Sequence, residues 1–153
     1  MLVLGLTLAA GNVFGQQFIR VKTKGVEVGT SKARVLGRIG KPLSTRKGGE
    51  YPCAERSVDM RYDGLLLELL ESQLDGEKGR LFVARMTITS RKWSVSGIRI
   101  GASPLAVRLK FGPARWQNEA RNRFLVYAIG DGSANFFFRR GRLFKIVSQL
   151  NVC

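Results

Sequence analysis

Two segments of the chain, each sixteen residues long, have nearly the same sequence pattern. The first, GVEVGTSKARVLGRIG, covers residues 25–40, and the second, GIRIGASPLAVRLKFG, covers residues 97–112. Identical positions in the two segments are Gly25 and Gly97, Gly29 and Gly101, Ser31 and Ser103, Val35 and Val107, and Gly40 and Gly112. A shorter match, GRLF at residues 79–82 and 141–144, follows in the same order. Two matches in one order predict an internal duplication, with residues 17–90 as the first repeat and residues 91–153 as the second.

Each segment carries the start and stop signals of a short helix. Ser31 and Ser103 stand at N-cap positions, where a side-chain oxygen accepts hydrogen bonds from the first free amides. Gly40 and Gly112 stand where the helices should stop, and a proline follows closely in both segments. Helices of about ten residues are marginal alone, so we expect a sheet to hold them.

The residues after each helix predict antiparallel strands separated by turns. The strands expected in the first repeat cover residues 56–62, 65–70 and 81–89, and those in the second cover residues 124–129, 135–139 and 143–150. Residues 65–70 also fit a helix, residues 17–23 suggest a short strand, and residues 41–52 read as a loop-rich insertion. We therefore expect an α+β fold of two tandem repeats, each a helix followed by three or four strands, with the helices packed on one face of an antiparallel sheet. One continuous sheet and two separate lobes both fit this pattern.

The Gly-x-x-x-Gly-x-Ser starts and the Ile-Gly-Lys-Pro and Phe-Gly-Pro ends of the two segments resemble a known repeat. It occurs in the small outer-membrane lipoproteins that help β-barrel assembly and, in tandem copies, in the secreted β-lactamase-inhibitor-like proteins. Residues 25–42 and 97–113 carry the resemblance. It implies an exported, non-catalytic α+β module that binds other macromolecules. This chain lacks the lipidated Cys of the lipoproteins, and its strong positive charge departs from the inhibitor.

The first sixteen residues suggest export. They carry no charge, and residues 2–10 form an apolar run that is too short for a spanning helix. Such a run is typical of the core of a secretory signal, although no basic residue precedes it, and an ordinary N-terminal strand is the alternative. We expect an exported protein, periplasmic or extracellular, with no lipidation signal and no transmembrane span.

The chain has two cysteines, Cys53 and Cys153. In an exported protein such a pair predicts one disulfide, whereas in the cytoplasm both would be free thiols.

The charge is strongly positive and uneven. The formal net charge is +15, and residues 91–153 hold twelve basic residues against only Glu119 and Asp131. This field attracts anionic partners such as nucleic acid, lipid headgroups, cell-wall polymers or acidic proteins.

A segment rich in phenylalanine and arginine, residues 135–142, is the best candidate for a contact surface. Aromatic and arginine side chains suit both protein interfaces and stacking on single-stranded nucleic acid. The alternative is that the phenylalanines belong to the core and the arginines to a solvated turn. The candidate binding residues are Phe136, Phe138, Arg139, Arg140 and Arg142, together with Trp116, Arg121 and Arg123 from a loop nearby in the sequence.

The sequence offers little for catalysis. It contains no His, which removes the usual general base and zinc ligand and every Ser-His or Cys-His nucleophile. No metal or cofactor motif is present, and the carboxylates of residues 59–71 read as turn and strand surface. We therefore expect a non-enzymatic interaction module for a protein or cell-envelope partner, or alternatively a cationic binder of nucleic acid or another anionic polymer. The oligomeric state stays open.

Overall fold

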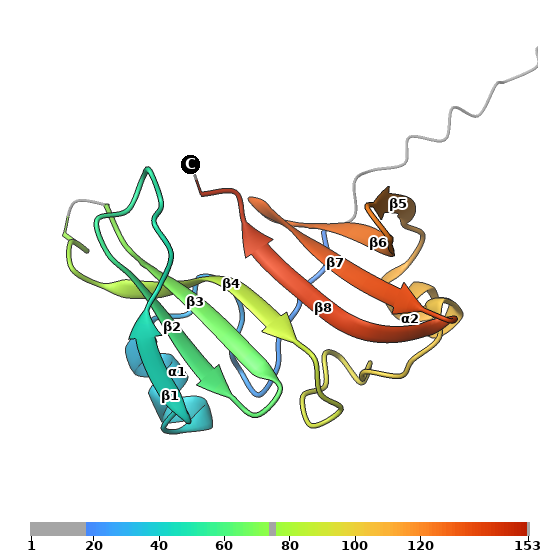
Figure 1. Ribbon diagram of the computed structural model, residues 1–153, viewed down its shortest axis with the longest axis horizontal. Helices are drawn as coiled ribbons and strands as arrows, with labels where there is room; N and C mark the ends of the chain where they lie inside the picture. Colours follow the sequence, from blue (N-terminus) through green and yellow to red (C-terminus); the bar gives the residue numbers. More distant parts are fainter. Residues whose placement is uncertain (1–17, 74–75, 153) are drawn as a thin grey trace, which may run out of the picture.

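One antiparallel sheet of eight strands forms the framework of the protein (Figure 1). The computed structural model describes residues 18–73 and 76–152, so the predicted secretory signal, residues 1–16, lies outside the described residues. The strand order is β1-β2-β3-β4-β8-β7-β6-β5. The elements in chain order are α1 (Lys32–Ile39), β1 (Ser44–Lys47), β2 (Ser57–Tyr62), β3 (Leu65–Glu71), β4 (Leu81–Ile88), α2 (Pro104–Phe111), β5 (Arg115–Glu119), β6 (Asn122–Ile129), β7 (Gly132–Arg139) and β8 (Arg142–Leu150).

The expected α+β class of tandem repeats is wrong, because the protein is a mainly β fold. The two helices have only eight residues each, whereas eight strands make one sheet. Two of these strands were not expected: β1 lies in the stretch predicted as an insertion, and β5 in the stretch predicted as a loop. Both are edge strands, with three of four and four of five side chains exposed. Neither has the alternation of apolar and polar residues by which a strand is recognised in a sequence.

β4 and β8 join the two parts of the sheet in its middle. Residues 85–88 of β4 pair with residues 146–149 of β8, so the strands that follow the two helices form one continuous sheet rather than two lobes. In both parts one helix precedes four strands in the chain. β3 is a strand along its whole length, which rejects the helical alternative for residues 65–70.

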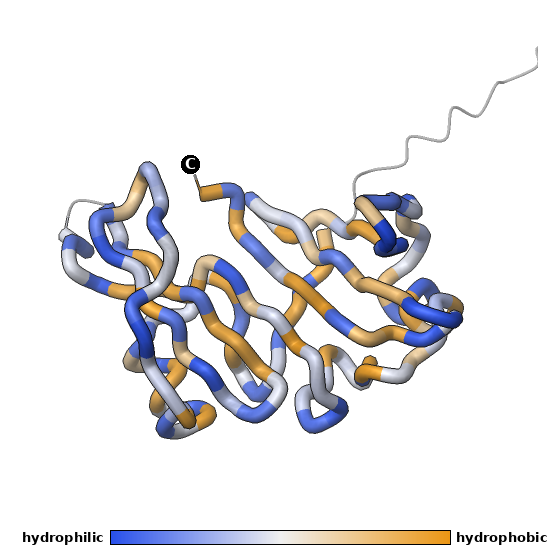
Figure 2. Tube along the Cα trace, in the orientation of Figure 1, coloured by the Kyte–Doolittle hydropathy of each residue, from blue (hydrophilic) through white to orange (hydrophobic). Residues whose placement is uncertain are grey.

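Both helices pack on the same face of the sheet, which we call the helix face, and Figure 1 shows them behind the strands under opposite halves. Val35 of α1 and Val107 and Phe111 of α2 are buried with the inward side chains of β2, β3, β4, β6, β7 and β8 in one main core. The central strands β3 and β4 are mostly apolar, with a few hydrophilic residues between the apolar ones (Figure 2).

Two matching tight turns precede the helices. In the first, residues 24 and 25 both have positive φ, and Thr23 and Val26 exchange backbone hydrogen bonds of 2.9 and 2.8 Å. In the second, residues 96 and 97 have positive φ, and Val95 and Ile98 exchange bonds of 2.8 and 2.9 Å. This backbone is that of a type I′ turn. Residues 17–23, predicted as a strand, belong to no strand of the sheet where the structure describes them and make only isolated bridges at Phe18 and Thr23.

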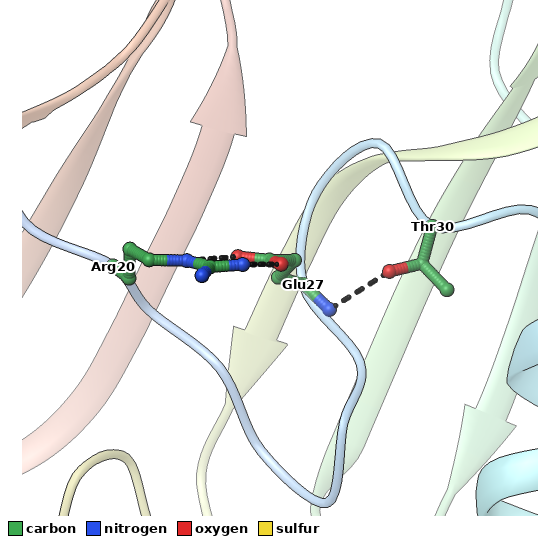
Figure 3. A network of polar contacts seen from close by, with 3 residues as sticks. All are labelled: Arg20, Glu27 and Thr30. Carbon is green, nitrogen blue, oxygen red and sulfur yellow. Dashed lines mark hydrogen bonds and ion pairs between the residues drawn. The ribbon is translucent and has the colours of Figure 1, made fainter.

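A polar network ties the segment before the first turn to the segment after it (Figure 3). The guanidinium of Arg20 forms an ion pair with the Glu27 carboxylate, and its Nε donates to Oε2 over 3.3 Å. The backbone N–H of Glu27 donates to Oγ1 of Thr30 over 3.0 Å. The hydrogen bond to Glu27 and its negative charge raise the pKa of Arg20. The network holds the loop that leads into α1.

Candidate interaction surface on the open face of the sheet

The sheet face opposite the helices, which we call the open face, carries no helix among the described residues. Buried residues outside the strands, such as Ile19, Trp93 and Val95, belong to the main core on the helix face. The second buried cluster consists of strand residues alone. A loop, residues 48–56, borders the open face near β3, where the hydroxyl of Tyr51 reaches Glu68.

An aromatic cluster lies on the open face over β6, β7 and β8. Phe124 and Phe137 are directly opposite each other in the β6–β7 register, and their ring centroids are 4.7 Å apart. Phe144 lies next, with its centroid 6.4 Å from that of Phe137. The members of the aromatic cluster are Phe124, Val126, Phe137, Phe144 and Val147.

Two cationic side chains lie over these rings. Nζ of Lys145 is 4.3 Å from the centroid of Phe137, and the guanidinium carbon of Arg139 is 4.5 Å from the centroid of Phe144. Long basic side chains can cover apolar surface with their stems while their charges stay in water, and a cation is attracted to the face of a ring. These two side chains therefore cover part of the aromatic cluster, while Val126 and Phe144 stay partly exposed.

A polar group lies nearer the middle of the same face. The hydroxyl of Tyr51 donates to Oε1 of Glu68 over 3.2 Å, and Nε of Arg85 is 3.5 Å from Oε2 of the same carboxylate. Burial, together with the negative charge of Glu68, raises the pKa of the Tyr51 hydroxyl. Arg85 is paired with Gln149 across the β4–β8 junction, and a shallow pocket lined by Tyr51, Arg85 and Gln149 opens there.

The expected contact surface is wrong for two of its residues. Phe136 and Phe138 are only 0% and 7% exposed and belong to the main core on the helix face. Phe136 pairs with Ile146, and their side chains point toward the helices. Phe137, between them, is the ring that faces the open side. The alternative prediction, that Phe136 and Phe138 belong to the core, is therefore confirmed.

The other predicted surface residues do not form one site. Trp116 packs on the main core, with Arg123 and Arg108 at 4.1 and 5.4 Å from its ring centroid, so it lies on the helix side of β5. Arg121 is exposed at the β5–β6 turn. The remaining predicted arginines are exposed at the β7–β8 hairpin, namely Arg139, Arg140 and Arg142. Only Arg139 contacts the aromatic cluster.

Sequence reasoning missed most residues of the open face. The sequence pattern predicts strands at Phe124 and Phe144 but not the face on which each side chain lies, and it gives no signal for Tyr51 or Lys145. β-Bulges shift the register at two places: β4 has an extra residue, Ala84, opposite residues 68–69 of β3, and β8 has an extra residue, Phe144, opposite residues 137–138 of β7. A bulge moves the following residues to the other face relative to simple alternation, so the pattern in the sequence cannot assign them.

The predicted capping residues occupy the ends of the helices. The side chain of Ser31 accepts a hydrogen bond from the backbone N–H of Arg34, and that of Ser103 accepts one from Ala106. Gly40 and Gly112 are the C-cap residues, with φ of 80° and 90°, a backbone region that favours glycine. These four residues therefore cap the ends of the two helices.

Cys53 lies in the loop that borders the open face and is disulfide-bonded. Cys153 lies outside the described residues, so its pairing with Cys53 stays a prediction. In the described part of the chain, no group of His, Cys, Asp and Glu could hold a metal ion, and no helix is long and apolar enough to cross a membrane.

Comparisons with known proteins show the fold alone. No protein-family model matches the chain, and no curated protein matches it significantly. An extracellular protein containing a SCP domain from Bacillus anthracis is 12% identical, with a TM-score of 0.52 over 81% of this chain and 44% of its own. A cysteine-rich secretory protein from Staphylococcus aureus is 12% identical, with a TM-score of 0.55 over 89% of this chain and 47% of its own. The chain thus spans less than half of either protein. Neither belongs to the groups that the sequence resembles, so that resemblance stays a prediction.

Proposed function

We propose that this chain is an exported, non-catalytic interaction module whose open face binds an acidic region of a partner protein in the cell envelope or outside the cell. The aromatic cluster under Lys145 and Arg139 carries the proposal. Aromatic residues, including phenylalanine, and arginine are enriched at protein interfaces. Cations around such a cluster select an acidic partner and speed its association.

Three observations support export. Residues 1–16 have the apolar pattern of a secretory signal. Cys53 is disulfide-bonded, and disulfides persist mainly in oxidising compartments. Both solved structures described above are, by their descriptions, an extracellular and a secretory protein.

Binding of nucleic acid or another anionic polymer is the second candidate, because residues 91–153 hold twelve basic and two acidic residues. The positions of the cations over the aromatic rings support binding of nucleic acid less than binding of a protein. Stacking needs an accessible ring face, but Arg123 lies over Trp116 and Lys145 lies over Phe137. Polymer binding would then depend on charge and would weaken steeply as salt rises.

A pull-down from envelope extract at about 0.1 and about 0.5 M salt separates the two candidates. We compare the wild type with Lys145→Glu on the open face and with Lys78→Glu, which makes the same charge change in the exposed turn between β3 and β4. We expect one acidic protein to be retained at both salt concentrations by the wild type and by Lys78→Glu, and to be lost from Lys145→Glu. Equal retention by the two variants would refute the proposed face. Recovery of nucleic acid or polymer at low salt alone would favour the second candidate.

A further inference from the structure

The outward side of α2 is apolar. Leu105 and Leu109 are 65% and 79% exposed, and residues four apart lie on the same side of a helix. The opposite side of α2 is also apolar, since Val107 and Phe111 are buried in the main core. A helix that is apolar on both sides is normally covered on both sides. No described element covers Leu105 and Leu109, and a contiguous exposed apolar patch is typical of an interaction site.

The fold itself does not require these leucines. The equivalent positions of α1, 72 residues earlier, hold Ala33 and Gly37, which are also exposed. α1 nevertheless packs through Val35, just as α2 packs through Val107. Packing of the helix on the sheet therefore does not need Leu105 and Leu109.

The exposed leucines lie among cations on the helix face. Among residues 18–73 and 76–152, four of the five exposed large hydrophobic residues are on the two helices or just after α1, namely Leu36, Leu43, Leu105 and Leu109. The helices add the exposed cations Arg34, Arg38 and Lys110 and the half-buried Lys32. Residues 28–49 and 99–118 contain no Asp or Glu. Exposed leucines combined with cations and no carboxylate are the features of a surface that binds anionic membranes.

We propose that the helix face binds the surface of an anionic phospholipid bilayer, with the exposed leucines inserted among the headgroups and the basic side chains on the lipid phosphates. This inference is independent of the proposed function, which uses the open face. An eight-residue helix is about 12 Å long. The side of one such helix therefore offers much less contact area than a stable protein interface buries. α1 and α2 lie under opposite halves of the sheet (Figure 1). A broad surface such as a bilayer can contact both helices at once.

Vesicle co-sedimentation with the full chain tests the inference. The probes are vesicles of phosphatidylcholine alone and of phosphatidylcholine with an equal part of phosphatidylglycerol. We expect the wild type to sediment with the anionic vesicles, and the double variant Leu105→Ser/Leu109→Ser to need about tenfold more lipid. The matched control, Ala33→Ser/Gly37→Ser, changes the equivalent positions of α1 and should bind like the wild type. All variants keep residues 1–16, so that segment contributes equally to each.

A spectroscopic variant reports insertion directly. In Leu109→Trp, after subtraction of the wild-type signal from Trp93 and Trp116, anionic vesicles should shift the added emission to shorter wavelength. Lipids brominated in the acyl chains should quench it. An equal lipid requirement for the serine double variant, an unshifted Leu109→Trp spectrum, or equal binding to phosphatidylcholine alone would each overturn the inference. A lipid-free dimer that depends on Leu105 and Leu109, seen by sedimentation velocity, would overturn it in favour of self-association.

Discussion

The hydroxyl of Tyr127 in β6 donates a hydrogen bond of 2.9 Å to the carbonyl oxygen of Gly112, the C-cap of α2. The hydroxyl of Tyr62 in β2 makes the same contact with Gly40, the C-cap of α1, over 2.8 Å. Each tyrosine thus links the C-terminal end of a short helix to a strand of the sheet by a hydrogen bond.

Replacing Tyr127 with phenylalanine should lower the free energy of unfolding by about 1 kcal/mol, because the Gly112 carbonyl loses its partner while the ring still packs. Tyr62→Phe should cost less, since its hydrogen bond is more exposed. Urea denaturation monitored by circular dichroism measures both. An unchanged midpoint in Tyr127→Phe would show that water replaces the hydroxyl at no cost.

Stability should fall at alkaline pH because burial raises the pKa of Tyr62 and Tyr127, with the positive charge of Arg108 opposing part of the shift at Tyr127. The folded protein prefers the neutral phenol. This stabilisation is complete below the unfolded pKa of about 10 and is lost as pH rises through the folded pKa. We expect absorbance at 295 nm to show phenolate forming at higher pH in the folded chain than in urea. The double variant Tyr62→Phe/Tyr127→Phe should lose less stability between about pH 9 and pH 11. Coincident titrations of the folded and unfolded chains would contradict the shift.

Thr23 and Val95 occupy the same position of the two matching turns, and both are buried. Oγ1 of Thr23 has no hydrogen-bond partner among the described residues. Thr23→Val removes an unsatisfied hydroxyl at nearly constant volume and should raise the free energy of unfolding by up to about 1 kcal/mol. The reverse change, Val95→Thr, should lower it by about 1–3 kcal/mol. If thermal melts of the two variants move in the same direction, the turns are not equivalent environments.

The predicted Cys53–Cys153 disulfide has a direct test. The intact mass should rise by two hydrogen atoms on reduction, and peptide mapping should recover the two cysteines linked. Closure of a loop of about 100 residues stabilises by up to about 4–5 kcal/mol in the chain-entropy model. Cys53→Ser should therefore unfold at clearly lower urea. Free-thiol labelling of both cysteines in the unreduced, unfolded chain would refute the bond.

The sequence predicts the helices and central strands well because their local signals agree with the final packing. The cap residues Ser31, Gly40, Ser103 and Gly112 mark two helices to within a residue or two. The apolar runs of β3, β4 and β8 are interior strands of the sheet, and burial alternates along most of β3 and at both ends of β4. The edge strands β1 and β5 escape prediction because partner strands, rather than their own side chains, give them their structure.

The candidate site was harder to predict than the fold. Residues 135–142 form a dense cluster of phenylalanine and arginine in the sequence, yet β7 places Phe136 and Phe137 on opposite faces of the sheet. The open face draws Tyr51, Glu68, Arg85 and Lys145 from a loop and three strands, distant in sequence. Among the strands of the sheet, β4 and β8 are the pair that joins the two parts, and no local sequence pattern predicts this pairing.

The position of β8 between β4 and β7 also governs how the protein can be made. β8 is the last of the eight strands along the chain, yet it completes the centre of the sheet. During synthesis, β1 to β4 emerge first, with β4 as an unpaired edge able to pair with a second nascent chain. The pairing of β4 with β8 spans about 60 residues, and contacts this distant in the chain slow folding. An export pathway that delivers the chain unfolded would leave this joining step until after translocation.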